Sequence, residues 1–157
     1  PAARPSSWSA LLSVPADLEG MHGGRERDAF PQLRRRPPDD RATESLCRLV
    51  LLGLLPALAE QDLPGFGDAL YDYNRRAGAL FQAAQGGVYA HPRIEALVAS
   101  LRAAGIRGVG QSSWGPIVFA IGDADQLAFA KEQIVTKGGA EQIWLARPSE
   151  HGAQAMA

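Results

Sequence analysis

The sequence predicts an α+β sandwich, in which a four-stranded, mainly antiparallel sheet carries helices on one face. Three observations predict this fold. The expected elements follow the order strand, three helices, strand, strand, helix, strand. The connection over residues 110–116 is so short that the two strands it joins must run antiparallel. The 157 residues suffice for one domain with a sizeable core.

Composition is ordinary for a globular domain and argues against several classes of function. Hydrophobic residues make up 46% and charged residues 21%, and a net charge of -1 gives no field for nucleic acid or an anionic membrane. Cys47 is the only cysteine, so we expect no disulfide, no metal site and a cytoplasmic location. The apolar run over residues 46–58 is shorter than a bilayer span, and we expect no membrane segment.

The first elements are a strand and a loop. Residues 8–14 (Trp-Ser-Ala-Leu-Leu-Ser-Val) predict a strand that Pro15 ends. Glycines make the next stretch a loop, with one helical turn expected over residues 25–30. His22 and Arg25 are possible site residues here, although an exposed loop without a role explains them as well.

Three helices should follow. Asp39 or Asp40 can cap a helix over residues 41–60, whose few polar positions predict burial nearly all round, and Pro56 should kink or end it. Apolar residues at three- and four-residue spacing predict further helices over residues 66–84 and 92–104.

The second half supplies the remaining strands. We expect strands over residues 106–109, 117–121 and 141–146 and a helix over residues 124–136, which complete a ferredoxin-like two-layer sandwich. Around the central hairpin, four apolar side chains should be buried and three polar ones exposed. The apolar four are Val109, Ile117, Val118 and Phe119, and the polar three are Gln111, Ser112 and Ser113.

The candidate binding loop lies between the two central strands. Its glycines let the backbone turn tightly and present successive N–H groups to one ligand, and its serines add hydroxyl donors. A plain connection is the alternative for the loop, and a packing residue is the alternative for its tryptophan. The candidate residues are Gly108, Gly110, Gln111, Ser112, Ser113, Trp114 and Gly115.

The runs Gln-Gly-Gly-Val-Tyr-Ala-His-Pro (85–92) and Gly-Val-Gly-Gln-Ser-Ser-Trp-Gly-Pro (108–116) resemble a known pattern. They are similar to the C-terminal half of the beta-ribofuranosylaminobenzene 5'-phosphate synthases, members of the GHMP kinase superfamily. The resemblance implies the C-terminal domain fold of that superfamily. It also implies transfer from phosphoribosyl pyrophosphate to a 4-substituted benzoate, with release of carbon dioxide and pyrophosphate, in methanopterin-type cofactor biosynthesis.

The resemblance further implies an N-terminal half with the main phosphate loop, and no Pro-x-x-x-Gly-Ser-Ser segment precedes Gly108. We therefore expect residues 1–157 to be a single domain that supplies one wall of an active site and is inactive alone. Its expected partners are the missing half and small-molecule substrates, and a homodimer is left open. No cofactor is expected in this chain, with Mg²⁺ entering beside phosphoribosyl pyrophosphate in the longer enzyme.

Two other functions stay open. The chain could be a fragment of a GHMP-type, ATP-dependent small-molecule kinase, although Gln-Ser-Ser in place of glycines argues mildly against that. It could also be a stand-alone ferredoxin-like binding module without catalysis. In a cut-out domain, we expect an exposed apolar patch where the missing half packs.

Overall fold

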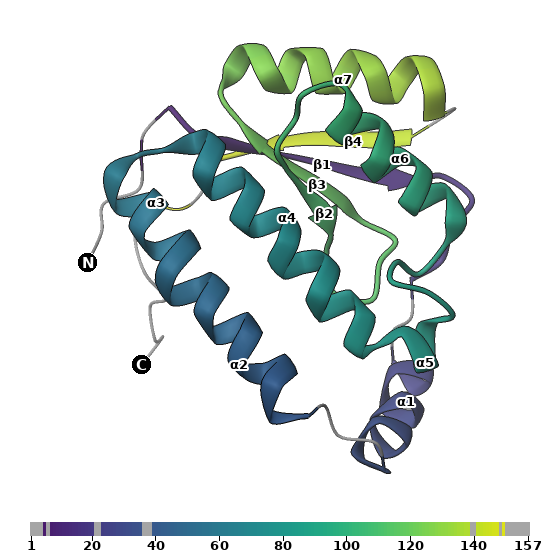
Figure 1. Cartoon of the computed structure of the whole chain (residues 1–157). Coiled ribbons are helices and arrows are strands. Elements are labelled where there is room, and N and C mark those ends of the chain that lie inside the picture. Colours follow the sequence, from purple (N-terminus) through teal and green to yellow (C-terminus); the bar gives the residue numbers. More distant parts are fainter. Residues whose placement is uncertain are drawn as a thin grey trace, which may run out of the picture.

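The sheet is fully antiparallel, with the strand order β2-β3-β1-β4 (Figure 1). The computed structural model describes residues 5, 7–20, 23–35, 39–138, 141–147 and 149. Its strands are β1 (Ser9–Pro15), β2 (Gly108–Gln111), β3 (Val118–Gly122) and β4 (Glu141–Ala146). The predicted α+β fold with a four-stranded antiparallel sheet is confirmed.

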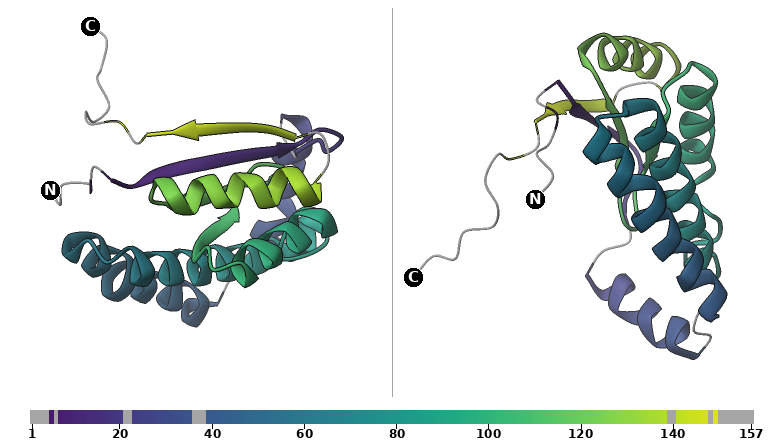
Figure 2. Two further views of the ribbon diagram at one scale, coloured as in Figure 1. Left: turned by 90° about the horizontal axis from the view of Figure 1, so that it is seen from above. Right: turned by 60° about the vertical axis from the view of Figure 1, so that its left-hand side comes forward.

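One face of the sheet builds the main core. Leu11 of β1 pairs with Ala120 of β3, and the alternation of side chains places both on the same buried face. Helices α6 (Pro92–Ala103) and α7 (Ala124–Gly138) cover this face, as Figures 1 and 2 show. Their buried side chains are Ile94, Leu97, Val98, Leu101, Leu127, Ala130 and Ile134.

The opposite face of the sheet is much less covered. Phe119 and Ile121 of β3 are half-buried there, and Trp144 of β4 is 48% exposed. Helix α4 (Leu63–Leu80) approaches this side at β2, where the backbone of Gly67 lies against Gly108. The edge strand is therefore the part of the sheet that α4 positions.

The helices before α4 depart from the sequence prediction. Helix α1 (Gly24–Arg35) is longer than the single turn expected and has Pro31 inside it. A continuous helix then runs through α2 (Asp40–Leu49), a π-helical segment (Val50–Leu54) and α3 (Leu55–Glu60). Asp39 caps it as predicted, because its side chain accepts a hydrogen bond from the Ala42 N–H at 2.6 Å.

Two predictions concern the middle of this helix. The helix continues past Pro56, and the disturbance predicted at this proline takes the form of a wider π-helical segment over the residues before it. The prediction that the helix is buried nearly all round is wrong, because Ala57 is its only buried residue. Each of its three segments packs against α4, and the helix lies on the outside of the molecule (Figure 2).

The same helix is long enough and apolar enough to cross a membrane. Asp40–Glu60 has 21 residues, and an 18-residue window within it has a mean hydropathy of 1.5 and is only 6% buried. Core helices of soluble proteins meet the same two criteria, so a single helix of this kind is weak evidence for a membrane.

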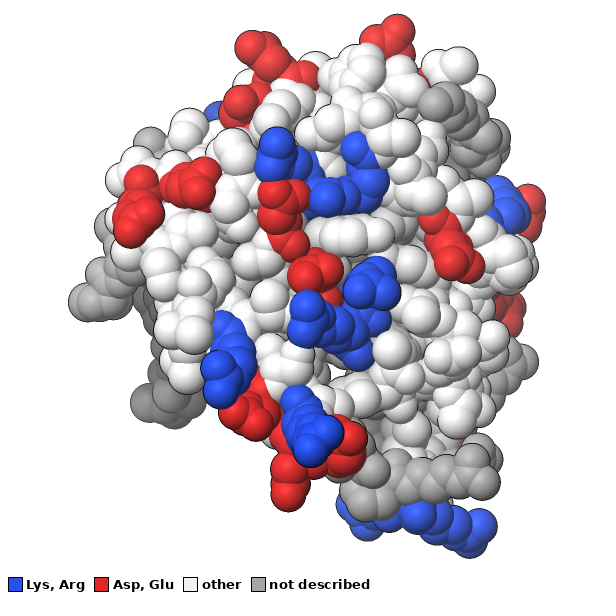
Figure 3. Space-filling view, in the orientation of Figure 1, with Lys and Arg blue, Asp and Glu red and all other residues white. Residues whose placement is uncertain are grey.

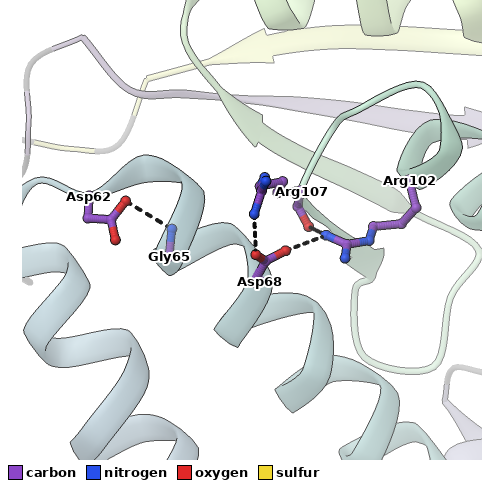
Figure 4. Close-up of polar contacts among 5 residues, drawn as sticks. All are labelled: Asp62, Gly65, Asp68, Arg102 and Arg107. Atoms are coloured by element: carbon purple, nitrogen blue, oxygen red, sulfur yellow. Dashed lines mark hydrogen bonds and ion pairs between the residues drawn. The ribbon is translucent and has the colours of Figure 1, made fainter.

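Polar contacts fix α4 at its beginning and along its length. Asp62 caps it by accepting a hydrogen bond from the Gly65 N–H at 3.0 Å (Figure 4). One turn further, Asp68 accepts hydrogen bonds from Arg102 at the end of α6 and from Arg107 just before β2. Arg102 also donates to the Arg107 carbonyl at 2.7 Å, so a single carboxylate ties three elements together.

Candidate functional site

The loop between β2 and β3 is shorter than the sequence predicts. Half of the predicted glycine loop belongs to β2, which runs from Gly108 to Gln111 instead of ending at Val109. The loop proper, residues 112–117, is closed by a hydrogen bond from the Ser112 N–H to the Ile117 carbonyl at 2.8 Å. A second bond runs from the Gly115 N–H to the Ser112 carbonyl at 2.9 Å. These internal bonds make the loop a defined turn.

Positive φ angles occur in this loop at one of the three candidate glycines and at a serine. Ser113 (φ 49°) and Gly115 (φ 69°) have them, and the peptide bond before Pro116 is cis. Gly108 and Gly110 are strand residues without a positive φ. Their lack of a side chain serves close packing instead, because a Cβ on Gly110 would overlap the Asn74 carboxamide and the Phe119 ring.

Asn74 of α4 pairs with the free edge of β2. Its Oδ1 accepts a hydrogen bond from the Gln111 N–H at 2.9 Å, and its Nδ2 donates to the Gln111 carbonyl at 2.8 Å. The carboxamide thus acts as a neighbouring strand would. Sequence reasoning missed Asn74, although an asparagine inside a helix is a signal that its side chain has another partner.

Gln111 is buried, at 4% exposure, so the prediction that it is exposed is wrong. Its Oε1 accepts a hydrogen bond from the Ala90 N–H at 2.7 Å, and its Nε2 donates to the Ser113 carbonyl at 2.8 Å. The Gln111 side chain therefore links the loop, at Ser113, to the segment before α6, at Ala90. Gln85 supports that segment by donating to the carbonyls of Gly87 and Val88.

The two serines at the tip are exposed, as predicted. No hydrogen bond from either hydroxyl is formed within the part of the chain that the structure describes. The backbone N–H groups of Gln111, Ser112 and Gly115 all donate within the protein, as described above. The donors that the loop can offer a ligand are therefore the two hydroxyls and the N–H groups of Ser113 and Trp114, which form no hydrogen bond with another described residue.

Trp114 packs inside the protein, at 6% exposure. Its ring meets Phe81 edge-on at 4.9 Å between centroids and Phe30 of α1 at 6.2 Å. The packing explanation for this residue therefore holds. Its burial still leaves part of the ring on the wall of the adjoining pocket.

A pocket of about 200 Å³ lies beneath the loop, between α4 and the segment that follows it. Its walls are aromatic and aliphatic side chains with three carboxamides, and it has no charged lining residue. The lining residues are Tyr73, Asn74, Ala77, Gly78, Phe81, Gln85, Val88, Gln111, Ser113 and Trp114. Such a pocket suits an uncharged ring better than a phosphate.

The remaining candidates are not brought to this pocket by any described contact. His22 lies outside the described residues, and Arg25 lies in α1 with a side chain outside the description. Gly108 belongs to the far end of β2, against Gly67. No group of three or more His, Cys, Asp or Glu that could hold a metal occurs among the residues described.

Sequence comparison matches a large part of this chain to one family. A family model described as "GHMP kinases C terminal" matches residues 54–140. Beta-ribofuranosylphenol 5'-phosphate synthase of Archaeoglobus fulgidus is 34% identical over 119 residues, which cover 75% of this chain and 34% of that protein. The synthase of the same name from Methanothermobacter thermautotrophicus is 29% identical, covering 76% and 34%. The chain thus spans about a third of the length of these relatives.

Solved structures show the same fold. The crystal structure of L. major mevalonate kinase in complex with R-mevalonate superposes with a TM-score of 0.68 at 18% identity, covering 94% of this chain and 45% of that one. Mevalonate diphosphate decarboxylase from Staphylococcus aureus gives a TM-score of 0.59 at 16% identity, covering 89% and 43%. At these identities the likeness concerns the fold alone.

Proposed function

The chain belongs to the GHMP kinase C-terminal family, and we propose that it is the C-terminal domain of a phosphoribosyl-transferring synthase. It is homologous to the C-terminal part of the beta-ribofuranosylphenol 5'-phosphate synthases. The proposed reaction joins phosphoribosyl pyrophosphate to a 4-substituted benzoate and releases carbon dioxide and pyrophosphate. The proposed setting is cytoplasmic methanopterin-type cofactor biosynthesis.

The observation that carries this proposal is a hydrogen-bonded loop with exposed hydroxyls beside an aromatic pocket. Breaking the bond between ribose C1 and pyrophosphate builds negative charge on the leaving group, which fixed donors stabilise. Ser112 and Ser113 are exposed donors on a turn whose backbone is held by Gln111. The uncharged pocket, walled by Phe81 and Trp114, suits the ring of the aromatic acid.

Mg²⁺ does not fit the described part of this site as a resident ion. The ion prefers carboxylate and water oxygens, and no carboxylate lines the pocket beneath the loop. We propose that any Mg²⁺ enters with the pyrophosphate group and is held outside this chain. This domain then contributes the hydroxyl donors and the ring pocket, and it is inactive without the rest of the enzyme.

The proposed partners are the part of a longer protein that precedes this domain, the two small-molecule substrates and a second copy of the chain. The length of the curated relatives supports the first of these, because the chain covers 34% of two of them. Under this proposal residues 1–157 act as one domain, and the main phosphate loop lies in the preceding part.

The test uses a longer protein that contains this chain. It is incubated with phosphoribosyl pyrophosphate and 4-hydroxybenzoate or 4-aminobenzoate labelled in the carboxyl group, and released carbon dioxide is counted. We expect release that depends on both substrates. Formation of ADP from ATP with a small alcohol, and no carbon dioxide, would instead support the alternative of a small-molecule kinase.

A double substitution tests the loop itself. Ser112→Ala with Ser113→Ala removes both hydroxyls and should lower kcat on the order of a hundredfold, with a small change in KM, if the hydroxyls act mainly on the developing charge. Thr136→Ala, at an exposed position on α7, is the matched control. Wild-type turnover in the folded double variant would show that the two serines are loop residues without a role in the reaction.

A further inference from the structure

The helix over residues 40–60 exposes one continuous face, which we call the outer leucine face. Its exposed positions recur at the three- and four-residue spacing of one helical stripe. The centre of the stripe is apolar, with Leu51 61% exposed, Leu52 73% and Leu55 48%. Figure 3 shows an uncharged stretch along this flank, on the left, with charged groups at both ends. Three adjacent exposed leucines are typical of an interaction surface.

The opposite side of this helix is already in use. Gly53 lies against Ala69 of α4, where an added Cβ would come within 3.0 Å of the Ala69 Cβ. Arg76 of α4 also donates a hydrogen bond to Ser45. Because α4 holds the inner side, the outer leucine face cannot be buried by rotating the helix.

The charges at the two ends of the helix indicate what covers this face. Arg41 lies in the first turn and Glu60 in the last, and each sits at the end of the helix dipole that disfavours its charge. Both side chains are exposed, and neither forms an ion pair with another described residue. In an antiparallel pair of such helices, each Arg41 lies beside the Glu60 of the other copy.

We propose that the outer leucine face pairs antiparallel with the same face of a second copy of this chain, about a two-fold axis close to Leu51. Leu51 lies about halfway between Arg41 and Glu60, so one axis brings the leucines together and both charge pairs into register. An isologous contact of this kind closes on itself and gives a dimer. The dipoles of two antiparallel helices side by side also attract each other.

A lipid bilayer fits this face less well. Arg41, Glu44, Arg48 and Glu60 lie on or beside the same stripe, and charged residues in a membrane-spanning segment are costly. Glu44 and Arg48 form an exposed ion pair at 2.8 Å, which suits a water-facing rim. The face therefore has the layout of a protein interface, with an apolar centre and a charged rim.

The first experiment measures association of the 157-residue chain by sedimentation velocity over a range of concentrations. We expect a monomer–dimer equilibrium that Leu52→Glu weakens at least tenfold. Val135→Glu is the matched control, because Val135 is 58% exposed on α7, away from this helix. A chain that is monomeric at every concentration would overturn the proposal, as would equal weakening by both substitutions.

Charge reversal tests the antiparallel register. Arg41→Glu and Glu60→Arg should each weaken the dimer, and the double reversal should restore it, because the pairing across the axis is rebuilt. Each single change improves the match to the helix dipole, so unfolding cannot explain a weaker dimer. Failure of the double variant to recover would overturn the register.

Cross-linking locates the axis. In a Cys47→Ser background, Leu51→Cys should form a disulfide-linked dimer rapidly under mild oxidation, whereas Val135→Cys should not. Binding of the chain to phosphatidylcholine vesicles, abolished by Leu52→Glu, would overturn the proposal in favour of a bilayer. A longer protein that stays monomeric and is destabilised by Leu52→Glu would overturn it in favour of burial against the preceding part.

Discussion

Helix α4 packs against β2 on one side and against the helix over residues 40–60 on the other, and the two contacts are of opposite kinds. Towards β2 the contacts are buried: Asn74 pairs with the Gln111 backbone, and Gly67 lies against Gly108. Towards the helix over residues 40–60, the hydrogen bond from Arg76 to Ser45 is exposed, and the outer face of that helix is uncovered. The difference shows where the fold needs a defined geometry. The β2 side supports the candidate loop, whereas the outer side carries a surface on which the geometry of that loop does not depend.

The largest contrast should come from adding the same methyl group on each side of α4. Gly110→Ala places a Cβ on the Asn74 carboxamide and the Phe119 ring, and the carboxamide cannot move without breaking both of its bonds to Gln111. We expect the free energy of unfolding to fall by about 3 kcal/mol, at the upper end of overpacking costs. Urea denaturation followed by circular dichroism measures the change.

Gly53→Ala is the comparison on the outer side. Its new Cβ would lie 3.0 Å from the Ala69 Cβ, a contact that a small shift of the outer helix relieves, and alanine favours the helix by about 1 kcal/mol. The net effect should stay within about 1 kcal/mol of zero. Equal losses at Gly110 and Gly53 would show that the two sides of α4 are equally constrained.

The next contrast removes one polar side chain from each side. Asn74→Ala leaves the buried N–H and C=O of Gln111 without their partner, which costs about 1–3 kcal/mol for an unsatisfied buried group. Ser45→Ala removes only an exposed acceptor of Arg76 and should cost less than about 0.5 kcal/mol. Hydrogen exchange at the Gln111 amide should quicken in the first variant only. An unchanged amide there would mean that Asn74 does not hold the edge of β2.

The same comparison explains which features the sequence predicts. The spacing of apolar residues, together with the prolines and glycines that end an element, predicts the strands, α6 and α7, because these elements bury a regular apolar face. Gly110 was correctly singled out, but for the wrong reason. A glycine needed for positive φ and a glycine needed for close packing look alike until the neighbouring helix is in place.

Two further misses have the same origin. Gln111 reads as an exposed loop residue because its partners, Asn74 and Ala90, are 37 and 21 residues away in sequence. The outer helix reads as buried because its composition is that of a core helix. Composition shows only that the helix is rich in leucine, whereas the fold shows that no described part of this chain covers the outer leucines.

A smaller contrast concerns ion pairs. Partial burial alone would raise the pKa of Asp68, but hydrogen bonds from Arg102 and Arg107 outweigh it and hold the pKa below its ordinary value of 3.8. A depressed folded-state pKa contributes stability above the unfolded value, and this contribution is lost as the pH falls below about 4. Asp68→Asn should therefore cost up to about 1 kcal/mol at pH 7 and flatten the acid limb.

Glu44→Gln is the control for that experiment, because the Glu44 and Arg48 side chains are 60% and 68% exposed. We expect it to change the free energy of unfolding by less than about 0.5 kcal/mol. Thermal unfolding at pH 3, 5 and 7 compares the two variants. An acid limb that is steeper in Asp68→Asn than in the wild type would contradict the assigned ion pairs.

The smallest effect is expected at Tyr89, next to the Ala90 N–H that Gln111 accepts from. Its hydroxyl is buried and has no hydrogen-bond partner among the described residues, so Tyr89→Phe should leave the free energy of unfolding unchanged or raise it by up to about 1 kcal/mol.

Burial raises the pKa of Tyr89 to about 12. A raised folded-state pKa means that the wild type keeps this contribution below about pH 10 and loses it as the pH rises towards 12, because the unfolded chain ionises first. Between pH 9 and 12, the free energy of unfolding should therefore fall more in the wild type than in the variant. Unfolding followed by fluorescence over this range measures the difference. A variant that is clearly less stable than the wild type at pH 7 would show that the hydroxyl has a partner in solution.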